Sequence, residues 1–441
     1  MKKKMRWESL LTEERLGGGG RSAASDARNE FQRDHDRIVF SSAFRRLHDK
    51  TQVFPMPEND HVHSRLTHSL EVSCVGRSLG TLVGASLVEK HRLREIAAPR
   101  DFGDIVAAAC LAHDIGNPPF GHSGEDAIRT WFRNPDRFCG ARLEDAERED
   151  LERFEGNAQG LRILTRLQMA TGRGGMRLTY ATLGAYGKYP RESLLAKDPG
   201  DRRSARKFGV FQSEKEILRT AADALGLISL SEKGAWWCRH PLAFLVEAAD
   251  DICYQILDLE DGFRLGKVRY EDAHDLLAAI PSDEASVRPA VPDDEKSMIG
   301  YLRARSIDVL VREVADLFLR EEENILDGSF DRALVDAIPS KGKVDAITAL
   351  VLRRCYQCGE VLEIEIAGYG VIGALLDRFV SAALKPAHPG HHRIRTLMPG
   401  LFPEERSDYE RILRVTDFVS GMTDTYAVSL FRRLSGIALP R

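Results

Sequence analysis

The fold is decided by residues 109–122, which read Ala-Cys-Leu-Ala-His-Asp-Ile-Gly-Asn-Pro-Pro-Phe-Gly-His. The apolar residues around its start predict a buried helix over 104–112 that ends at an adjacent imidazole and carboxylate, His113 and Asp114. Two prolines and two glycines follow, and they stop the helix in a stiff turn. An imidazole and a carboxylate are both ligands of divalent metal ions, so the pair is interpreted as half of a metal site.

Two other segments offer the rest of such a site. They are RLTHSLEV, which begins at Arg65, and EAADDICY, which begins at Glu247. A lone His-Asp pair is more often an ordinary polar pair than a metal site, and the ordered set favours the metal. Along the chain that set runs His68, His113-Asp114, Asp250.

Longer strings narrow the class of protein. KTQVF at 50–54, RLTHSLEV, HDIG, then GH at 121–122 and SGMTD at 420–424 follow one another along the chain. In this order they resemble the deoxynucleoside triphosphate triphosphohydrolases, the dGTPase family of HD-domain phosphohydrolases. The resemblance runs from about residue 5 to residue 436. It implies a metal-dependent enzyme that converts a dNTP, dGTP or several dNTPs, to a deoxynucleoside and inorganic triphosphate.

The resemblance also implies the metal ligands. Two imidazoles and two carboxylates suit a divalent ion such as Mn²⁺, Mg²⁺, Fe²⁺, Co²⁺ or Ni²⁺. Four protein ligands on a six-coordinate ion leave two positions for water and a phosphate oxygen. Asp250 is preferred as the last ligand because Tyr254 and Asp258 then share its helix face, and the adjacent Asp251 remains the alternative. The implied ligands are His68, His113, Asp114 and Asp250.

His122 and Glu125 are the predicted acid–base pair. They stand three residues apart at the start of a predicted helix, so the carboxylate can orient the imidazole. The resemblance places this pair beside the α-phosphate. There His122 would position or deprotonate the attacking water, or protonate the leaving oxygen, and the sequence does not choose between these roles.

A triphosphate substrate requires cations. By resemblance, Arg65, Lys188 and Lys207 are the expected phosphate contacts. Arg45 and Arg46 are equally compatible with the site, with a subunit interface and with surface ion pairs.

The deoxyribose is expected to meet three other side chains. By resemblance, Gln52 hydrogen-bonds the 3′-OH, Asp258 is its partner, and the Tyr254 ring packs on the sugar. A tyrosine against C2′ leaves little room for a ribose hydroxyl, which predicts a preference for dNTP over NTP.

Composition sets broad limits. The chain has 441 residues, 43% of them hydrophobic, with a net charge of −4 and a mean hydropathy of −0.30. A charge this balanced does not indicate bulk binding of nucleic acid. The seven scattered cysteines include one CxxC without a second pair, and they favour a reducing compartment. The sequence predicts no signal peptide or membrane span, and a cytoplasmic enzyme is expected.

Periodicity predicts an all-α fold, an HD-domain helical fold with at most a short strand or hairpin. Residues 1–24, with the run Gly17–Gly20, are expected to be flexible, and 25–441 to form one large domain. Its HD core would span about 60–262 and its C-terminal helical part about 298–441. One strand is predicted at Gly359–Ala367, and polar loops at 191–206 and 281–297. Helices are predicted at 26–49, 66–88, 104–112, 123–133, 155–169, 241–260, 298–326, 343–357, 372–384 and 406–435.

Partners and alternatives complete the hypothesis. The resemblance implies a homo-oligomer, with a hexamer plausible, and leaves room for a dNTP effector; binding of single-stranded nucleic acid has no support in the sequence. One alternative is another HD-family nucleotidase or phosphodiesterase, which would not need the distal cations Lys188 and Lys207. The other is a regulatory module that binds dNTPs or single-stranded nucleic acid. The complete ligand set and acid–base pair argue against that module.

Overall fold

The computed structural model describes residues 4–18, 27–52, 63–138, 140–169, 175–196, 200–281, 294–398 and 407–438. Parts of the polar loops predicted at 191–206 and 281–297, and the end of the KTQVF string, lie outside these ranges. The elements are α1 (Trp7–Leu10), α2 (Glu30–Val39), α3 (Ser42–Arg46), η1 (Leu47–Asp49), α4 (Arg65–Lys90), α5 (Pro99–Ala112), α6 (Gly121–Phe132), η2 (Pro135–Phe138), α7 (Asp145–Glu152), α8 (Gly156–Arg162), η3 (Ile163–Leu167), α9 (Tyr180–Tyr186), η4 (Arg203–Ala205), η5 (Gln212–Glu214), α10 (Lys215–Leu225), α11 (Pro241–Arg264), α12 (Tyr270–Ala278), α13 (Glu295–Leu326), η6 (Val335–Ala337), α14 (Lys341–Val351), η7 (Leu352–Tyr356), α15 (Gly359–Leu384), α16 (His391–Thr396), α17 (Asp408–Ser420) and α18 (Asp424–Leu434).

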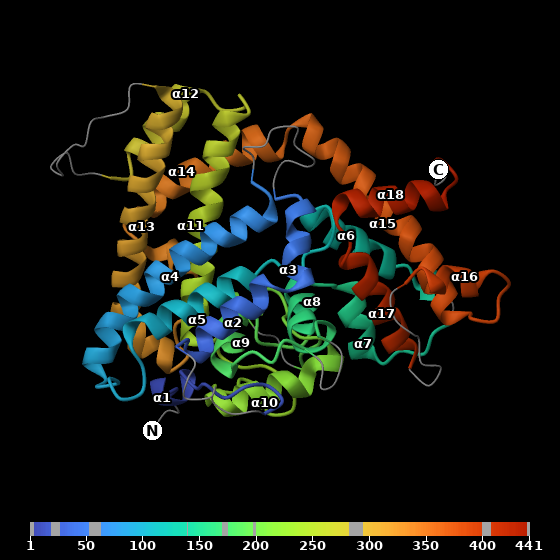
Figure 1. Ribbon diagram of the computed structural model, residues 1–441, viewed down its shortest axis with the longest axis horizontal. Coiled ribbons are helices and arrows are strands. Elements are labelled where there is room, and N and C mark those ends of the chain that lie inside the picture. The colour runs from blue at the N-terminus through green and yellow to red at the C-terminus, as the bar shows by residue number, and fades with distance from the viewer. Residues whose placement is uncertain are drawn as a thin grey trace.

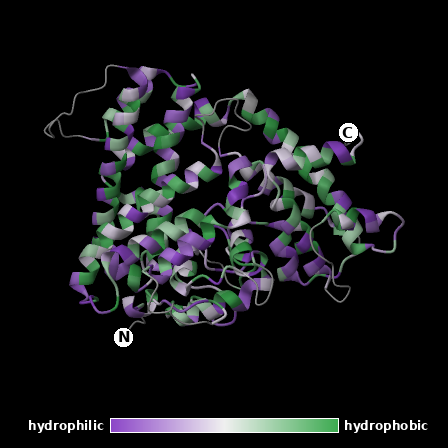
Figure 2. Ribbon diagram, viewed as in Figure 1, coloured by the Kyte–Doolittle hydropathy of each residue, from purple (hydrophilic) through white to green (hydrophobic). Residues whose placement is uncertain are grey.

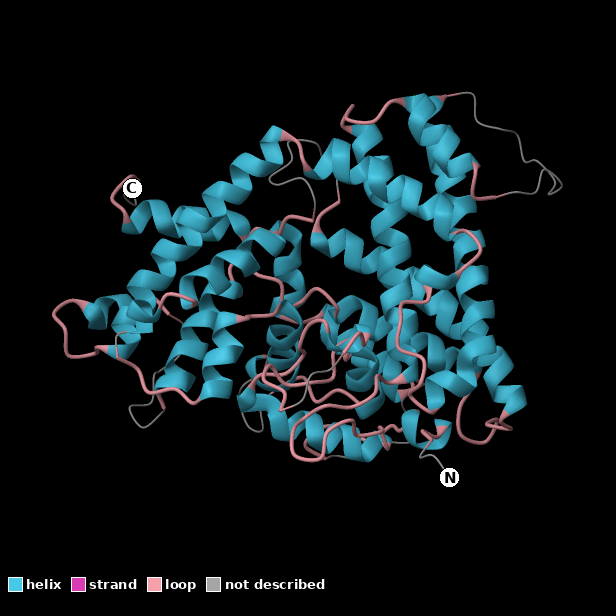
Figure 3. Cartoon of the chain, turned by 180° about the vertical axis from the view of Figure 1, so that it is seen from behind, coloured by secondary structure: helices cyan, strands magenta, loops and turns pink. Residues whose placement is uncertain are grey.

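The all-α prediction is confirmed. Figure 3 shows helices joined by loops, and the described residues form no sheet, only isolated bridges such as Thr51 with Ser64. The strand predicted at Gly359–Ala367 is wrong, because these residues form the first part of α15. Two alternating Glu-Ile pairs suggested a strand. The buried positions Val361, Gly368 and Val371 instead follow the helical period.

Two long predicted helices are broken. The prediction at 26–49 becomes α2, α3 and η1, because the Ser41 hydroxyl accepts the Phe44 N–H and starts a new helix. The prediction at 406–435 becomes α17 and α18, because Thr423 caps the second helix in the same way. Both breaks occur where a hydroxyl residue offers the backbone another hydrogen bond.

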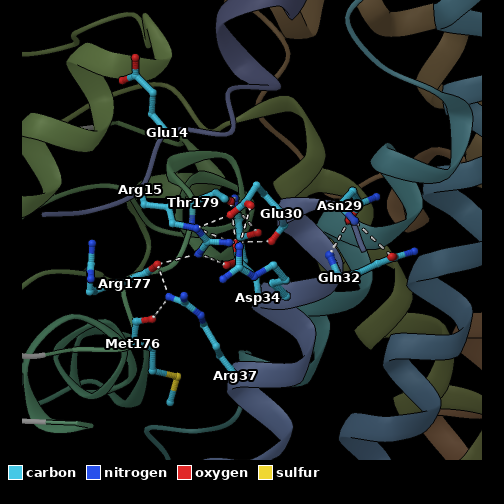
Figure 4. A network of polar contacts seen from close by, with 12 residues as sticks. Glu14, Arg15, Asn29, Glu30, Gln32, Asp34, Arg37, Met176, Arg177 and Thr179 are labelled. Atoms are coloured by element: carbon cyan, nitrogen blue, oxygen red, sulfur yellow. Dashed lines mark hydrogen bonds and ion pairs between the residues drawn. The ribbon is translucent and has the colours of Figure 1, made fainter. Parts of the chain in front are cut away.

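Residues 4–18 correct the expectation of a flexible segment over 1–24. Trp7 and Leu10 of α1 are buried in the core. Figure 4 shows Arg15 inside a polar network, where its guanidinium pairs with Glu30 and Asp34 at 2.6 Å each. Buried apolar side chains and a paired arginine therefore hold this part of the segment in place.

The centre of the molecule is built from α4, α5 and α11. The helices α4 and α5 pack closely, because Gly76, Gly80 and Gly84 face α5 at four-residue spacing. A Cβ on Gly80 would lie 2.6 Å from the Phe102 carbonyl oxygen, too close for any side chain there. The helix α11 packs against both, so the ends of three long helices are fixed relative to one another.

Buried apolar side chains form two clusters. The first, here called the central core, joins α1–α5 with α9–α14. The second, here called the C-terminal core, joins α6, α7 and η2 with α15–α18. In Figure 1, α4, α11 and α13 lie on the left and α15, α17 and α18 on the right. Figure 2 shows both hydrophobic and hydrophilic residues along the long helices, as expected for amphipathic helices packed on a core.

One segment of α15, Val361–Leu384, is long and apolar enough to cross a membrane by length and composition alone. Half of that segment is buried inside the protein. Ile372, Leu376 and Phe379 of its second half are fully buried in the C-terminal core, where α15 packs against α6 and α17. In its first half, Leu362 and Ile366 are exposed.

Candidate active site

The predicted metal ligands come together from three helices. His68 lies in the first turn of α4, His113 at the end of α5 and Asp250 in the middle of α11. Asp250 Oδ1 is 3.2 Å from His68 Nε2 and 3.5 Å from His113 Nε2. Ligand atoms of His68, His113 and Asp114 lie within 4.8 Å of one another.

The orientation of His113 fits a metal ion. Its Nδ1 donates to the Cys110 carbonyl oxygen at 2.6 Å, so the proton is on Nδ1 and the lone pair on Nε2. That Nε2 is buried and has no hydrogen-bond partner among the described residues. Of the two adjacent carboxylates, only Asp250 contacts both histidines, although Asp250 and Asp251 both line the cavity described below.

The carboxylates of this centre are held in the ionised form. Burial opposes ionisation of Asp114, but Arg65 and the two histidines outweigh it and lower the pKa well below its usual range. Burial likewise opposes ionisation of Asp250, and His113, His68 and Lys188 lower its pKa. Ionised carboxylates together with imidazole nitrogens are a donor set for a divalent cation.

The predicted acid–base pair lies at the start of α6. Phe120 and Gly121 both have left-handed backbones, with φ of 62° and 58°, and they turn the chain sharply into the helix. The His122 side chain is 80% exposed, whereas Glu125 is buried. The Glu125 carboxylate accepts a hydrogen bond from His122 Nδ1 at 3.2 Å. His122 Nε2 is then the ring atom left for a ligand or a proton.

Several groups stabilise the Glu125 carboxylate. Its other oxygen accepts the Gly156 N–H at 2.6 Å. Burial favours the neutral acid, but the hydrogen bond with His122 and the nearby Lys207 and Arg129 cations lower the pKa of Glu125 to about 2. Glu125 is therefore an acceptor throughout the physiological pH range, and it fixes the ring of His122.

A cavity of about 320 Å³ connects these groups. The candidate metal centre lies on one wall of this cavity, and His122 lies on another. A volume of this size is within the ordinary range for small-molecule sites. The lining residues are Gln52, Arg65, His113, Asp114, Asn117, His122, Glu125, Asn157, Tyr186, Lys188, Tyr189, Lys207, Val246, Glu247, Asp250, Asp251, Tyr254 and Tyr356.

All three predicted phosphate cations line the cavity, and each is paired with a carboxylate. Arg65 donates to Asp114 at 2.6 Å. Lys188 lies 3.6 Å from a carboxylate oxygen of Glu247. Lys207 lies 3.4 Å from Glu155 and 3.9 Å from Glu125. The two lysines lie farther from their carboxylates than Arg65 does from Asp114. An anionic ligand would therefore compete more easily for the lysines than for Arg65.

The predicted sugar contacts also lie on the cavity, with one difference. Gln52 lines it, and its buried Oε1 has no partner within the described part of the chain. Tyr254 lines it too, and its ring packs against Tyr356 with centroids 5.9 Å apart. The difference concerns Asp258, which was expected to be the partner of Gln52. Its carboxyl instead accepts a hydrogen bond from the Tyr356 hydroxyl at 2.6 Å. Burial raises the pKa of Asp258 to about 8.

Sequence reasoning missed several residues of the cavity, and three of them bond or pair with a candidate site residue. Tyr356 stands inside the Cys355–Cys358 motif, which was interpreted only as a lone CxxC. Asn117 donates to Asp114 Oδ1 at 2.6 Å, and its i+3 spacing from Asp114 could have indicated it. Glu247 is the acidic partner of Lys188, and nothing in the local pattern pointed to that contact.

Comparison with known proteins identifies the class. The family model of the HD domain matches residues 65–154. That range contains His68, the His113-Asp114 pair and the His122–Glu125 pair, and Asp250 lies beyond it. The chain is therefore an HD-domain protein, a class whose paired histidines and aspartates bind divalent metal ions.

Full-length relatives define the family. A protein of Synechocystis sp. named deoxyguanosinetriphosphate triphosphohydrolase-like protein is 47% identical over 448 residues, covering 99% of this chain and all of the relative. A protein of Pseudomonas aeruginosa with the same name is 44% identical over 99% of this chain and its own full length. A deoxyguanosinetriphosphate triphosphohydrolase of Serratia proteamaculans is 31% identical, covering 93% of this chain and 94% of the relative. The chain belongs to the deoxyguanosinetriphosphate triphosphohydrolase-like family.

Proposed function

We propose that this protein is a metal-dependent hydrolase that converts a dNTP and water to a deoxynucleoside and inorganic triphosphate. One observation carries the proposal: a single cavity contains the candidate metal centre, the exposed imidazole of His122 and three cations. The names of the relatives refer to dGTP, which makes dGTP the first substrate to test. Hydrolysis of several dNTPs is the broader form of the proposal.

His68, His113, Asp114 and Asp250 would hold the metal. A bound divalent ion such as Mn²⁺, Mg²⁺, Fe²⁺, Co²⁺ or Ni²⁺ would supply Lewis-acid stabilisation of the α-phosphate and lower the pKa of a water. The Nδ1–H bond from His113 to Cys110 keeps the lone pair of this histidine directed at the centre. Asp250 is preferred over Asp251 because it contacts both histidines.

The His122–Glu125 pair moves the proton. Glu125 holds Nδ1, so His122 Nε2 is the atom that takes a proton from water or gives one to the leaving O5′ oxygen. The high exposure of His122 in the cleft supports this role, because the ring can reach a ligand.

Arg65, Lys188 and Lys207 would bind the triphosphate. Phosphate oxygens are stronger anionic partners than the distant carboxylates that now face the two lysines, so the lysines would exchange partners when substrate binds. They would also stabilise the negative charge that builds up on the triphosphate oxygens when water attacks the α-phosphorus and O5′ leaves.

Gln52, Tyr254 and Asp258 would recognise the sugar. Tyr254 would pack against C2′, and the unsatisfied Gln52 Oε1 would accept a hydrogen bond from the 3′-OH. Asp258 would act through Tyr356, since its carboxyl accepts from that hydroxyl. The proposal also includes assembly into a homo-oligomer, for which a hexamer is one plausible form. It further includes a dNTP effector and a cytoplasmic location.

The experiment is product analysis. The protein is incubated with each of the four dNTPs and with Mn²⁺, Mg²⁺ or Co²⁺, and the phosphorus products are separated by anion exchange. We expect inorganic triphosphate and deoxynucleoside in equal amounts, and only when metal is added. Release of orthophosphate or dNMP would indicate another HD-family nucleotidase or phosphodiesterase. Binding of dNTP without turnover would indicate a regulatory module.

A further inference from the structure

The C-terminal string SGMTD, residues 420–424, lies directly behind the active site. Asp424 begins α18 and is 2% exposed. One of its carboxylate oxygens accepts both the backbone N–H and the hydroxyl of Thr51, at 3.0 and 2.5 Å. The other accepts the backbone N–H of Phe120 at 2.9 Å. A single carboxylate thus joins two segments that are about 70 residues apart in the chain.

Each of those segments carries a candidate site residue. Thr51 immediately precedes Gln52, and Phe120 stands two residues before His122. Phe120 has a left-handed backbone, which costs free energy for a residue other than glycine and needs fixed surroundings. The hydrogen bond to Asp424 fixes the N–H of this strained residue, and so the entry of the chain into α6.

Lys50 joins the same three segments a second time. Its buried ammonium donates to the Asn117 carbonyl oxygen at 2.5 Å and to the Ser420 carbonyl oxygen at 2.9 Å. Residues 50–52, the Pro-Pro turn at 117–121 and the string at 420–424 are therefore tied together by two side chains, Lys50 and Asp424. None of these bonds involves His68, His113 or Asp250.

We propose that Asp424 is a positioning residue for the reaction, holding the Phe120 turn and the Thr51–Gln52 backbone so that His122 and Gln52 face one substrate. The proposal rests on the proposed function for the roles of His122 and Gln52. The SGMTD string would then stabilise the active site through Asp424, although Asp424 itself does not line the cavity.

Asp424→Asn is the variant of choice. Both carboxylate oxygens now accept from N–H or O–H donors. An asparagine keeps one oxygen and presents an NH₂ group in place of the other, so one backbone N–H would face a donor. A displacement of about 1 Å at a reacting group can cost about 10²-fold in rate. We expect a loss in kcat of at least about 10-fold, with metal affinity within about 2-fold of wild type.

The chain contains a matched control. Asp34 of α2 is equally buried, and its carboxylate also accepts a threonine backbone N–H and hydroxyl, those of Thr179, at 2.9 and 2.7 Å. Figure 4 shows this arrangement beside Arg15, among residues that do not line the active-site cavity. Asp34→Asn perturbs the same kind of threonine-to-carboxylate bonds, together with the ion pair to Arg15, without touching the site. It should lower Tm and leave kcat per folded molecule within about 2-fold.

The experiment compares wild type, Asp424→Asn and Asp34→Asn in kcat, KM, Mn²⁺ affinity and Tm, and in amide hydrogen exchange of peptides covering 115–125. We expect faster exchange in these peptides and a lower kcat in Asp424→Asn only. Unchanged exchange and kcat in Asp424→Asn, or an equal loss of kcat in both variants, would overturn the proposal. Exchange does not depend on turnover, so it tests the positioning even if wild type releases no triphosphate and the proposed function fails.

Thr51→Val protects the test against misfolding of Asp424→Asn. It removes only the hydroxyl bond to Asp424 and keeps the backbone bond. A lower kcat at unchanged Tm and unchanged Mn²⁺ affinity would support the proposal. A kcat equal to that of wild type would count against it.

Discussion

The metal half and the acid–base half of the site are built in different ways. The candidate ligands His68, His113 and Asp250 stand on helices of 26, 14 and 24 residues that share the central core. His122 and Glu125 stand on α6, a helix of 12 residues that packs in the C-terminal core. The first half is fixed by packing of long helices. The second is fixed by a strained turn and by hydrogen bonds from distant segments.

This difference indicates which residues of the site depend on distant parts of the chain for their position. The close approach of α4 and α5 leaves little freedom to the metal ligands, as the contacts at Gly76 and Gly80 show. The position of His122 depends instead on Phe120, whose N–H is bonded to Asp424 on the far side of the sequence. The two halves are therefore expected to lose function separately, and variants of the metal ligands, His122 and Tyr254 test this separation.

The largest effect is expected from the metal half. His113→Ala or Asp114→Ala should abolish bound metal and reduce turnover by at least about 10³-fold, because the Lewis acid is lost. Metal content is measured by elemental analysis after dialysis against a fixed Mn²⁺ concentration. Near-normal metal in either variant would show that these residues are not ligands. His48→Ala, which removes an exposed imidazole from η1, is the control and should change neither quantity.

The acid–base half should show a smaller and more selective effect. His122→Ala should lower kcat by about 10²- to 10⁴-fold while metal and dNTP binding are retained, because His122 acts on a proton and is not a proposed ligand. Calorimetry with dNTP and Mn²⁺ measures both affinities. If dNTP affinity collapses together with kcat, His122 belongs to the binding machinery and the separation of the halves is lost.

Some parts of the fold could be predicted from the sequence, and others could not. Long helices such as α4, α11 and α13 could be predicted from their apolar periodicity, and the candidate metal ligands were proposed from the family resemblance that the ordered motifs carry. The beginning of α15 was missed because two Glu-Ile pairs mimic a strand locally, while its core contacts lie further along the chain. Periodicity reports which face is buried, but not the tertiary partner.

The candidate site was predictable only where residue types are distinctive. Imidazoles and carboxylates in order indicated the metal half, and His122 with Glu125 followed from i, i+3 spacing. The Asp258–Tyr356 bond joins positions 98 residues apart, and Asp424 reaches Phe120 across 304. No local pattern records such distances. These contacts form only when distant segments of the chain pack together within each core, so they could not be predicted from the local sequence.

The smallest expected effect concerns the sugar, and it sharpens the comparison. Tyr254 lies one helical turn after Asp250 on α11, so the metal half also carries the sugar contact. Tyr254→Ala should lower dNTP turnover and narrow the dNTP/NTP ratio, which in wild type should be about 10²-fold from crowding and an unpaired hydroxyl. Steady-state kinetics on dGTP and GTP measure the ratio. Metal content should remain normal, and equal rates of dGTP and GTP hydrolysis by wild type would refute a deoxyribose gate.

The central claim is that both halves act at the α-phosphorus, where water attacks and the P–O5′ bond breaks. It is tested most directly by hydrolysis of dGTP in ¹⁸O-labelled water, followed by mass spectrometry of both products. The account predicts one ¹⁸O in the inorganic triphosphate and none in the deoxyguanosine, because the P–O5′ bond is the one that breaks. Label in the deoxyguanosine, or in released orthophosphate, would contradict it.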